Sequence, residues 1–200
     1  MSQKLKLGFL ASRNGSSARA VVAAIEAGTL NGEARLMVSN NKSAGALDFA
    51  AERGIPTVCI PTQSDPEAAD RRLAEALEGA GVELVVLSGY LRQLGPHTLA
   101  RYRGRVLNIH PGPLPDFGGH GMYGRRVHEA VIAAGVPASC ATIHVVDEEY
   151  DHGPVVAQRS VPVEPGDTVE ALEARVRDAE PGFFVDCLQR LAAGDLVLPT

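Results

Sequence analysis

The sequence predicts an α/β fold with a doubly wound, mostly parallel sheet that gains antiparallel strands late in the chain. Short β-like runs alternate with helical runs over roughly the first half of the chain, as expected for successive strand–helix units. The run VELVVLSG (82–89) is almost continuously apolar, which is typical of a strand buried on both faces of a parallel sheet. Two β-like runs, SCATIHVVD (139–147) and PVVAQRSVPV (154–163), are joined by a short turn, which indicates antiparallel pairing.

The other elements follow from apolar periodicity and from the residues that begin and end helices. Strands are expected at 4–11, 34–40, 56–61 and 105–110, and helices at 16–28, 44–54, 65–81, 96–104 and 123–135. Asp65 and Pro66 are typical of an N-cap and a first helical position. A last helix is expected from Thr168, and Pro181 should kink it or divide it in two.

Composition excludes several classes of protein. The net charge of −5 argues against nucleic-acid binding as the main task, because phosphate contacts need a basic face. The three cysteines lie far apart, and neither HExxH nor GxSxG occurs, so neither a metal site nor a serine hydrolase is expected. The sequence shows no signal-peptide apolar region and no run long enough to span a bilayer, so we expect a cytoplasmic enzyme without a membrane partner.

The first candidate site is ASRNGSSARA (11–20), where a strand ends, a polar turn follows and a helix begins. Backbone N–H groups and the helix dipole favour an anion at such a turn, and Asn14, Ser16 and Ser17 could add side-chain donors. An ordinary N-cap turn fits the spacing equally well. The pattern matches neither GxGxxG nor a P-loop, so a dinucleotide or a nucleoside triphosphate is not indicated.

The second candidate site is LNIHPGPLPDFGGHGMYG (107–124). Asn108 and His110 are two apart on a strand, so their side chains share one face. They stand at a carboxyl end, where α/β enzymes place reactive groups, and a glycine- and proline-rich loop follows. His can transfer protons near neutral pH, and Asn can donate to an oxyanion. This loop favours ligand contact over simple burial of the histidine, and we expect it to become ordered when ligand binds.

The third candidate site is DEEYDHGPVV (147–156), an acidic connection between two strands. Asp147, Glu148 and Glu149 are most simply a solvated turn. Asp151 differs because the Gly-Pro that follows His152 fixes its direction. If the fold brings Asp151 beside His110, the carboxylate should raise the pKa of the imidazole and orient it. His144 on the preceding strand fits a buried or near-site histidine better than a metal ligand.

Together these motifs resemble the glycinamide ribonucleotide formyltransferases, which use 10-formyltetrahydrofolate. ASRNGSS, VVLSGYLRQLGP, LNIHPGPLP and DEEYDHGPVVAQRSVPV match the family in order over nearly the whole chain. The resemblance implies a Rossmann-like formyltransferase fold in a single domain (1–200), with a ribonucleotide phosphate-binding half (1–107) and a catalytic, folate-binding half (108–200). It implies direct formyl transfer to the ribonucleotide amine through a tetrahedral oxyanion, with no metal, in a monomer or homodimer.

The resemblance also implies roles for particular residues. Asn108, His110 and Asp151 would form the catalytic trio, with protonated His110 and Asn108 stabilising the oxyanion. Residues expected to contact the ribonucleotide and its phosphate are Asn14, Gly15, Ser16, Ser17, Pro111 and Glu180. Residues expected to contact the folate are Leu91, Arg92, Gln93, Leu94, Asn108, Val146, Glu149 and Tyr150.

This chain departs from the family pattern at several positions. Arg13 stands where relatives carry Gly, and Ser17 stands where they carry Asn, so the phosphate loop could use different donors. Pro181 follows Glu180 where many relatives have His, which places the role of Glu180 in question.

Three other functions were weighed against this one. Formyltetrahydrofolate deformylase has the same trio but usually an N-terminal regulatory domain, whereas this chain begins at the first strand. Methionyl-tRNA formyltransferase carries an added C-terminal domain. A catalytically silent folate- or nucleotide-binding protein is disfavoured by the intact trio.

Overall fold

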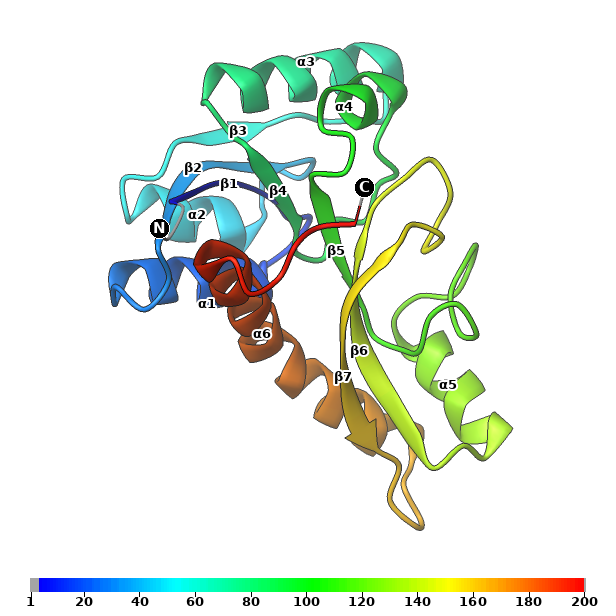
Figure 1. Cartoon of the computed structure of the whole chain (residues 1–200). Coiled ribbons are helices and arrows are strands. Elements are labelled where there is room, and N and C mark those ends of the chain that lie inside the picture. Colours follow the sequence, from blue (N-terminus) through cyan, green and yellow to red (C-terminus); the bar gives the residue numbers. More distant parts are fainter. Residues whose placement is uncertain (1–3, 200) are drawn as a thin grey trace.

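The chain forms one seven-stranded sheet with helices on both faces (Figure 1). The structure is a computed structural model and describes residues 4–199, so residues 1–3 and 200 of the expected domain lie outside it. The strand order is β3-β2-β1-β4-β5-β6-β7, in which β5–β6 and β6–β7 pair antiparallel and all other pairs are parallel. The predicted fold class is therefore confirmed.

The elements alternate along the chain as expected. The strands are β1 (Leu5–Leu10), β2 (Gly32–Ser39), β3 (Thr57–Cys59), β4 (Leu84–Leu87), β5 (Val106–His110), β6 (Ala138–Val145) and β7 (Val155–Pro162). The helices are α1 (Ser16–Glu26), α2 (Gly45–Ala51), α3 (Pro66–Gly79), α4 (Pro96–Arg101), α5 (Arg125–Ala134) and α6 (Val169–Ala193).

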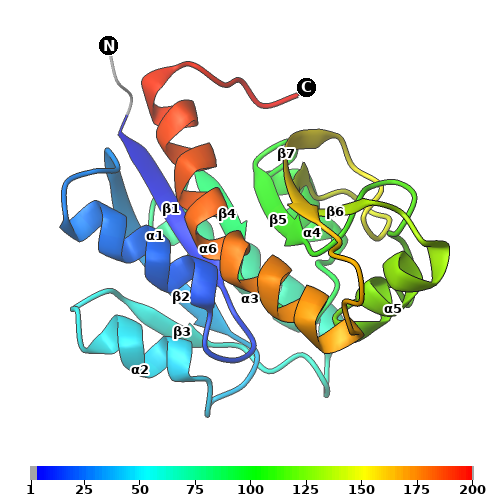
Figure 2. The ribbon, with the colours of Figure 1, turned by 90° about the horizontal axis from the view of Figure 1, so that it is seen from below.

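Two apolar clusters lie on opposite faces of the sheet. Helices α1, α2, α5 and α6 contribute to one cluster, and α3 and α4 pack into the other (Figures 1 and 2). Strand β4 is buried by both, because Leu84 and Val86 belong to the first cluster whereas Val85 and Leu87 belong to the second. This explains the continuous apolar run at 82–89.

The order of the strands reverses beside β1, where α/β sheets bind ligands at their carboxyl ends. Ser12, just after β1, connects three loops at this edge through hydrogen bonds. Its hydroxyl donates to Asn40 Oδ1 at 2.6 Å and accepts from the backbone N–H of Leu91 at 2.8 Å. The loops after β1, β2 and β4 are thereby held side by side.

Of the two outcomes expected at Pro181, division of the last helix does not occur, because α6 continues through this residue. Proline removes one backbone hydrogen bond and costs roughly 3 kcal/mol inside a helix. Phe183, Phe184 and Leu188 are buried just beyond it, and their burial outweighs that cost. The expected helix starts are confirmed: Asp65 accepts from Ala68 N at 2.9 Å, and Thr168 caps α6.

Candidate active site

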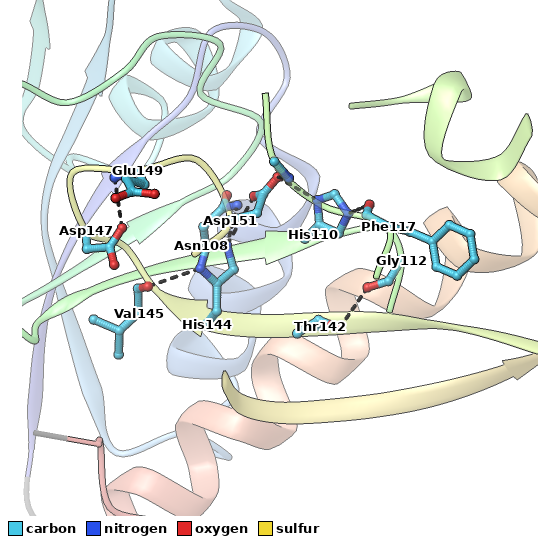
Figure 3. A network of polar contacts seen from close by, with 11 residues as sticks. Asn108, His110, Gly112, Phe117, Thr142, His144, Val145, Asp147, Glu149 and Asp151 are labelled. Atoms are coloured by element: carbon cyan, nitrogen blue, oxygen red, sulfur yellow. Dashed lines mark hydrogen bonds and ion pairs between the residues drawn. The ribbon is translucent and has the colours of Figure 1, made fainter. Parts of the chain in front are cut away.

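The three residues of the expected catalytic trio lie together, and His144 joins them (Figure 3). Asn108 and His110 end β5, while Asp151 comes from the turn between β6 and β7. His110 Nδ1 is 3.3 Å from Asp151 Oδ2. His144 Nε2 lies 3.1 Å from Asn108 Nδ2 and 3.5 Å from Asp151 Oδ1. The sheet therefore brings two imidazoles to one carboxylate.

Asp151 is held in place by the turn that follows it. Its φ of 55° lies in the left-handed region, which is uncommon for a residue other than glycine. A side chain at Gly153 would collide with the carbonyl oxygen of Val145, so only glycine fits there. The backbone N–H of Gly119 donates to Asp151 Oδ2 at 3.2 Å. The Gly-Pro signal that singled out Asp151 thus has a structural basis.

His110 is buried, and both of its ring nitrogens face oxygen atoms of the protein. Nε2 lies 2.8 Å from the carbonyl oxygen of Phe117, and Nδ1 faces Asp151. Burial lowers the pKa of His110 below its usual value, although the Asp151 carboxylate acts to raise it. Asp151 thus acts on this pKa in the expected direction, but desolvation of the imidazole outweighs the attraction of its neighbour.

Asp151 stays ionised more readily than an ordinary carboxyl group. Burial alone would raise the pKa of Asp151, but its polar neighbours, among them the Gly119 N–H, bring it below its usual value. Asp151 is therefore a carboxylate near neutral pH.

The loop after β5 packs closely on this cluster. A side chain at Gly112 would meet Val127, and one at Gly118 would meet Leu114. Thr142, the partner of His110 across the sheet, donates to the Gly112 carbonyl oxygen at 2.8 Å. At 112 and 118, glycine is therefore needed for packing of the loop itself.

A small cavity of about 80 Å³ opens beside the cluster. Of the eight residues expected to contact the folate, all but Leu91 line it. Gln93 Nε2 donates to the Glu148 carbonyl oxygen at 3.0 Å and so joins the two walls. Leu87 and Tyr90, from the stretch that resembles the family's folate pocket, also line the cavity, as do Asp147, the near-site histidine His144 and the catalytic candidate Asp151.

A larger cavity of about 430 Å³ lies next to the first, and Arg92 lines both. Its wall consists of Ser12, Arg13, Asn40, Asn41, Lys42, Pro61, Gln63, Leu91 and Arg92. Three of these residues are cationic and none is acidic. Leu91, which is expected to contact the folate, lines this larger cavity.

The polar turn before α1 has the geometry expected of an anion site. Gly15 is the N-cap, with φ 62° and ψ 56°, and no side chain caps this helix. The N–H groups of a first helical turn have no acceptor within the helix. Ala18 N–H is already bound to Ser88 Oγ at 3.0 Å, which leaves Ser16 and Ser17 to offer theirs. Ser17 is buried and Ser16 is exposed.

None of the six residues expected at the ribonucleotide lines either cavity: Asn14, Gly15, Ser16, Ser17, Pro111 and Glu180. Glu180 lies on α6, which packs against α1. Burial raises the pKa of Glu180 to about 7, and Arg177 opposes the rise only in part. None of the described residues donates a hydrogen bond to this carboxyl group.

Two features are absent from residues 4–199. No group of three or more His, Cys, Asp or Glu side chains within that range is placed to hold a metal ion. Within the same range, no helix combines the length and the apolar character needed to cross a membrane.

Comparison with known proteins places this arrangement in a family. The model of the formyl transferase family matches residues 5–188, and the chain belongs to this family. A phosphoribosylglycinamide formyltransferase of Bacillus subtilis is 31% identical over 188 residues, covering 93% of this chain and 94% of that protein. The crystal structure of glycinamide ribonucleotide transformylase 1 from Symbiobacterium toebii superposes with a TM-score of 0.87 at 31% identity, covering 98% and 91% of the two chains.

Plant relatives are longer than this chain. The chloroplastic phosphoribosylglycinamide formyltransferase of Vigna unguiculata is 38% identical over 197 residues, which cover 98% of this chain but 63% of that protein. The chain thus spans just under two thirds of the length of the plant relatives that it matches.

Proposed function

We propose that the protein transfers a formyl group from 10-formyltetrahydrofolate to the amine of glycinamide ribonucleotide, giving formylglycinamide ribonucleotide in purine biosynthesis. The observation that carries the proposal is the small cavity, in which Asn108 and Asp151 face a slot lined by seven of the eight expected folate contacts. Relatives of this protein that are named for this reaction support the same assignment. One of them is nearly equal in length to this chain.

In the proposed mechanism, the ribonucleotide amine attacks the formyl carbon and a tetrahedral oxyanion forms. The Asn108 amide donates to this oxyanion. The Asp151 carboxylate, which faces the cavity, accepts a proton from the attacking amine and passes it, directly or through water, to the leaving folate nitrogen. His110 contacts Asp151 on the side that faces away from the cavity. The contact between His110 Nδ1 and Asp151 Oδ2, at 3.3 Å, fixes the direction of the carboxylate.

Both substrates are anionic, and the larger cavity offers the matching charge. Arg13, Lys42 and Arg92 line it without an acidic neighbour. The first-turn amides at Ser16 and Ser17 form a second place for an anion, which we assign to the ribonucleotide phosphate, with Asn14 and Gly15 shaping the turn. In this scheme Arg13 adds charge beside the phosphate turn where relatives carry glycine.

We further propose that the chain acts as one domain in the cytoplasm, as a monomer or homodimer, with its ribonucleotide half (1–107) and catalytic half (108–200) meeting at the small cavity. Residues of both halves line that cavity, and the first half also supplies the expected folate contacts Arg92, Gln93 and Leu94. The proposed co-substrate is 10-formyltetrahydrofolate, and the mechanism needs neither a metal nor a covalent intermediate.

The test is a formyl-transfer assay. The protein is mixed with 10-formyltetrahydrofolate or a stable formyl-folate analogue, and the deformylated folate is followed by absorbance with and without glycinamide ribonucleotide. We expect product only when the ribonucleotide is present. Product in its absence would instead identify a deformylase, and folate binding without product would identify a binding protein.

A further inference from the structure

His144 lies at the centre of the site, although no sequence motif marks it. It stands on β6, and the register pairs it with Asn108 on β5. The side chain is 2% exposed. Its Nδ1 lies 3.1 Å from the Val145 carbonyl oxygen, and its Nε2 lies 3.1 Å from Asn108 Nδ2 (Figure 3).

The chemistry of these neighbours determines where the imidazole carries its proton. A carbonyl oxygen can only accept, so Nδ1 must carry the hydrogen that faces Val145. In a neutral ring Nε2 then has a lone pair, which accepts a hydrogen from the Asn108 amide. A charged ring would need an acceptor at Nε2. The nearest carboxylate oxygen, Asp151 Oδ1, is 3.5 Å away, outside the roughly 2.7–2.9 Å of a charge-assisted hydrogen bond.

We propose that neutral His144 is a positioning residue for formyl transfer, which orients the Asn108 amide by accepting one of its two N–H groups. The inference rests on the proposed function. A free Asn amide has two orientations that exchange its oxygen and its nitrogen. With one N–H held by His144, the second remains for a ligand in the cavity that both residues line. The reversed amide would present its oxygen to a developing negative charge.

The kinetic test compares His144→Gln with His144→Leu. The Gln side chain keeps an oxygen that can accept from Asn108, whereas Leu has no acceptor. We expect Leu to lower kcat roughly 10- to 100-fold, less than the roughly 100- to 1000-fold loss when an oxyanion donor is removed, while KM for the folate changes less than about threefold. Gln should recover most of the lost kcat. Equal losses in both variants would overturn the proposal.

A double-mutant cycle tests whether His144 acts through Asn108. In an Asn108→Ala background, His144→Leu should cause almost no further loss, because the group that it orients is already gone. A full, additive loss in that background would contradict the positioning role. Thermal unfolding of each variant controls for folding.

The proton itself can be observed in the unmodified protein. In the long-range ¹H–¹⁵N spectrum of histidine-labelled protein near pH 7, His144 should show a neutral ring with its hydrogen on Nδ1, assigned by its loss in the Gln variant. A charged ring, or a hydrogen on Nε2, would overturn the proposal even if the Leu variant failed to fold. Absence of formyl transfer by the wild-type protein would instead overturn the proposed function.

Discussion

Replacing Glu180 by Gln should stabilise the protein at alkaline pH. Glu180 is largely shielded on α6, and burial raises its pKa from 4.5 to about 7. The folded state therefore holds this proton more tightly than the unfolded state does. The resulting contribution to stability is fully present below about pH 4.5 and is lost as the pH rises through about 7.

The size of the effect follows from the shift in pKa. Each pKa unit corresponds to about 1.4 kcal/mol, so a rise from 4.5 to about 7 amounts to about 3 kcal/mol at pH 8. Partial exposure of the carboxyl group to solvent reduces this to about 2 kcal/mol. At pH 5 the folded state is protonated and the unfolded state is only partly ionised, so the effect there is under about 1 kcal/mol.

The assay is urea unfolding at pH 5 and at pH 8, monitored by circular dichroism. Glu180→Gln should gain stability over the wild type at pH 8 by about 1–2 kcal/mol more than at pH 5. Asp178→Asn, an exposed carboxyl group on the same helix, is the matched control and should show no such difference. If the Gln variant differed from the wild type equally at both pH values, Glu180 would not be held protonated, and the reasoning would be refuted.

Three further predictions concern the site. His110→Ala should cut turnover by orders of magnitude. Folate binding should stay nearly intact, because His110 lines neither cavity. Replacement of the exposed His97 by Ala is the control, and near-normal turnover of the His110 variant would exclude a role of His110 in the reaction. Gly153→Ala should lower the free energy of unfolding by about 2 kcal/mol or more, since the new Cβ would collide with the Val145 carbonyl oxygen; urea unfolding measures this, and a loss below about 0.5 kcal/mol would contradict it. Amide hydrogen exchange over 111–124 should slow when folate binds, and equal exchange would argue against ordering of the loop by ligand.

The sequence predicted the order and type of the elements because these depend on local patterns. The apolar run at 82–89 and the helix start at Asp65 carry their structural meaning within a few residues. The continuity of α6 through Pro181 could not be predicted in this way. It depends on burial of Phe183 and Phe184 against elements distant in the chain, which outweighs the local preference of proline.

The site shows the same division between local and long-range information. Asn108 and His110 share a face because of strand periodicity, and Gly153 marks the turn that directs Asp151. His144 has no such local signal. Its place beside Asn108 follows from the antiparallel register of β5 and β6, which a sequence without its pairing partners does not reveal.

The protonation of the site residues depends strongly on tertiary packing, which the sequence motifs do not show. A motif that puts Asp151 near His110 predicts a charged imidazole, because the carboxylate attracts the proton. The fold also buries His110 against the 111–124 loop, which includes Phe117. The resulting loss of hydration affects the pKa of His110 more than the Asp151 carboxylate does. Asp151 reaches the cavity wall while His110 does not. In the proposed mechanism, proton transfer to and from the substrates is therefore assigned to the carboxylate at the cavity wall and not to the imidazole next to it, a distinction that the order of residues along the chain does not contain.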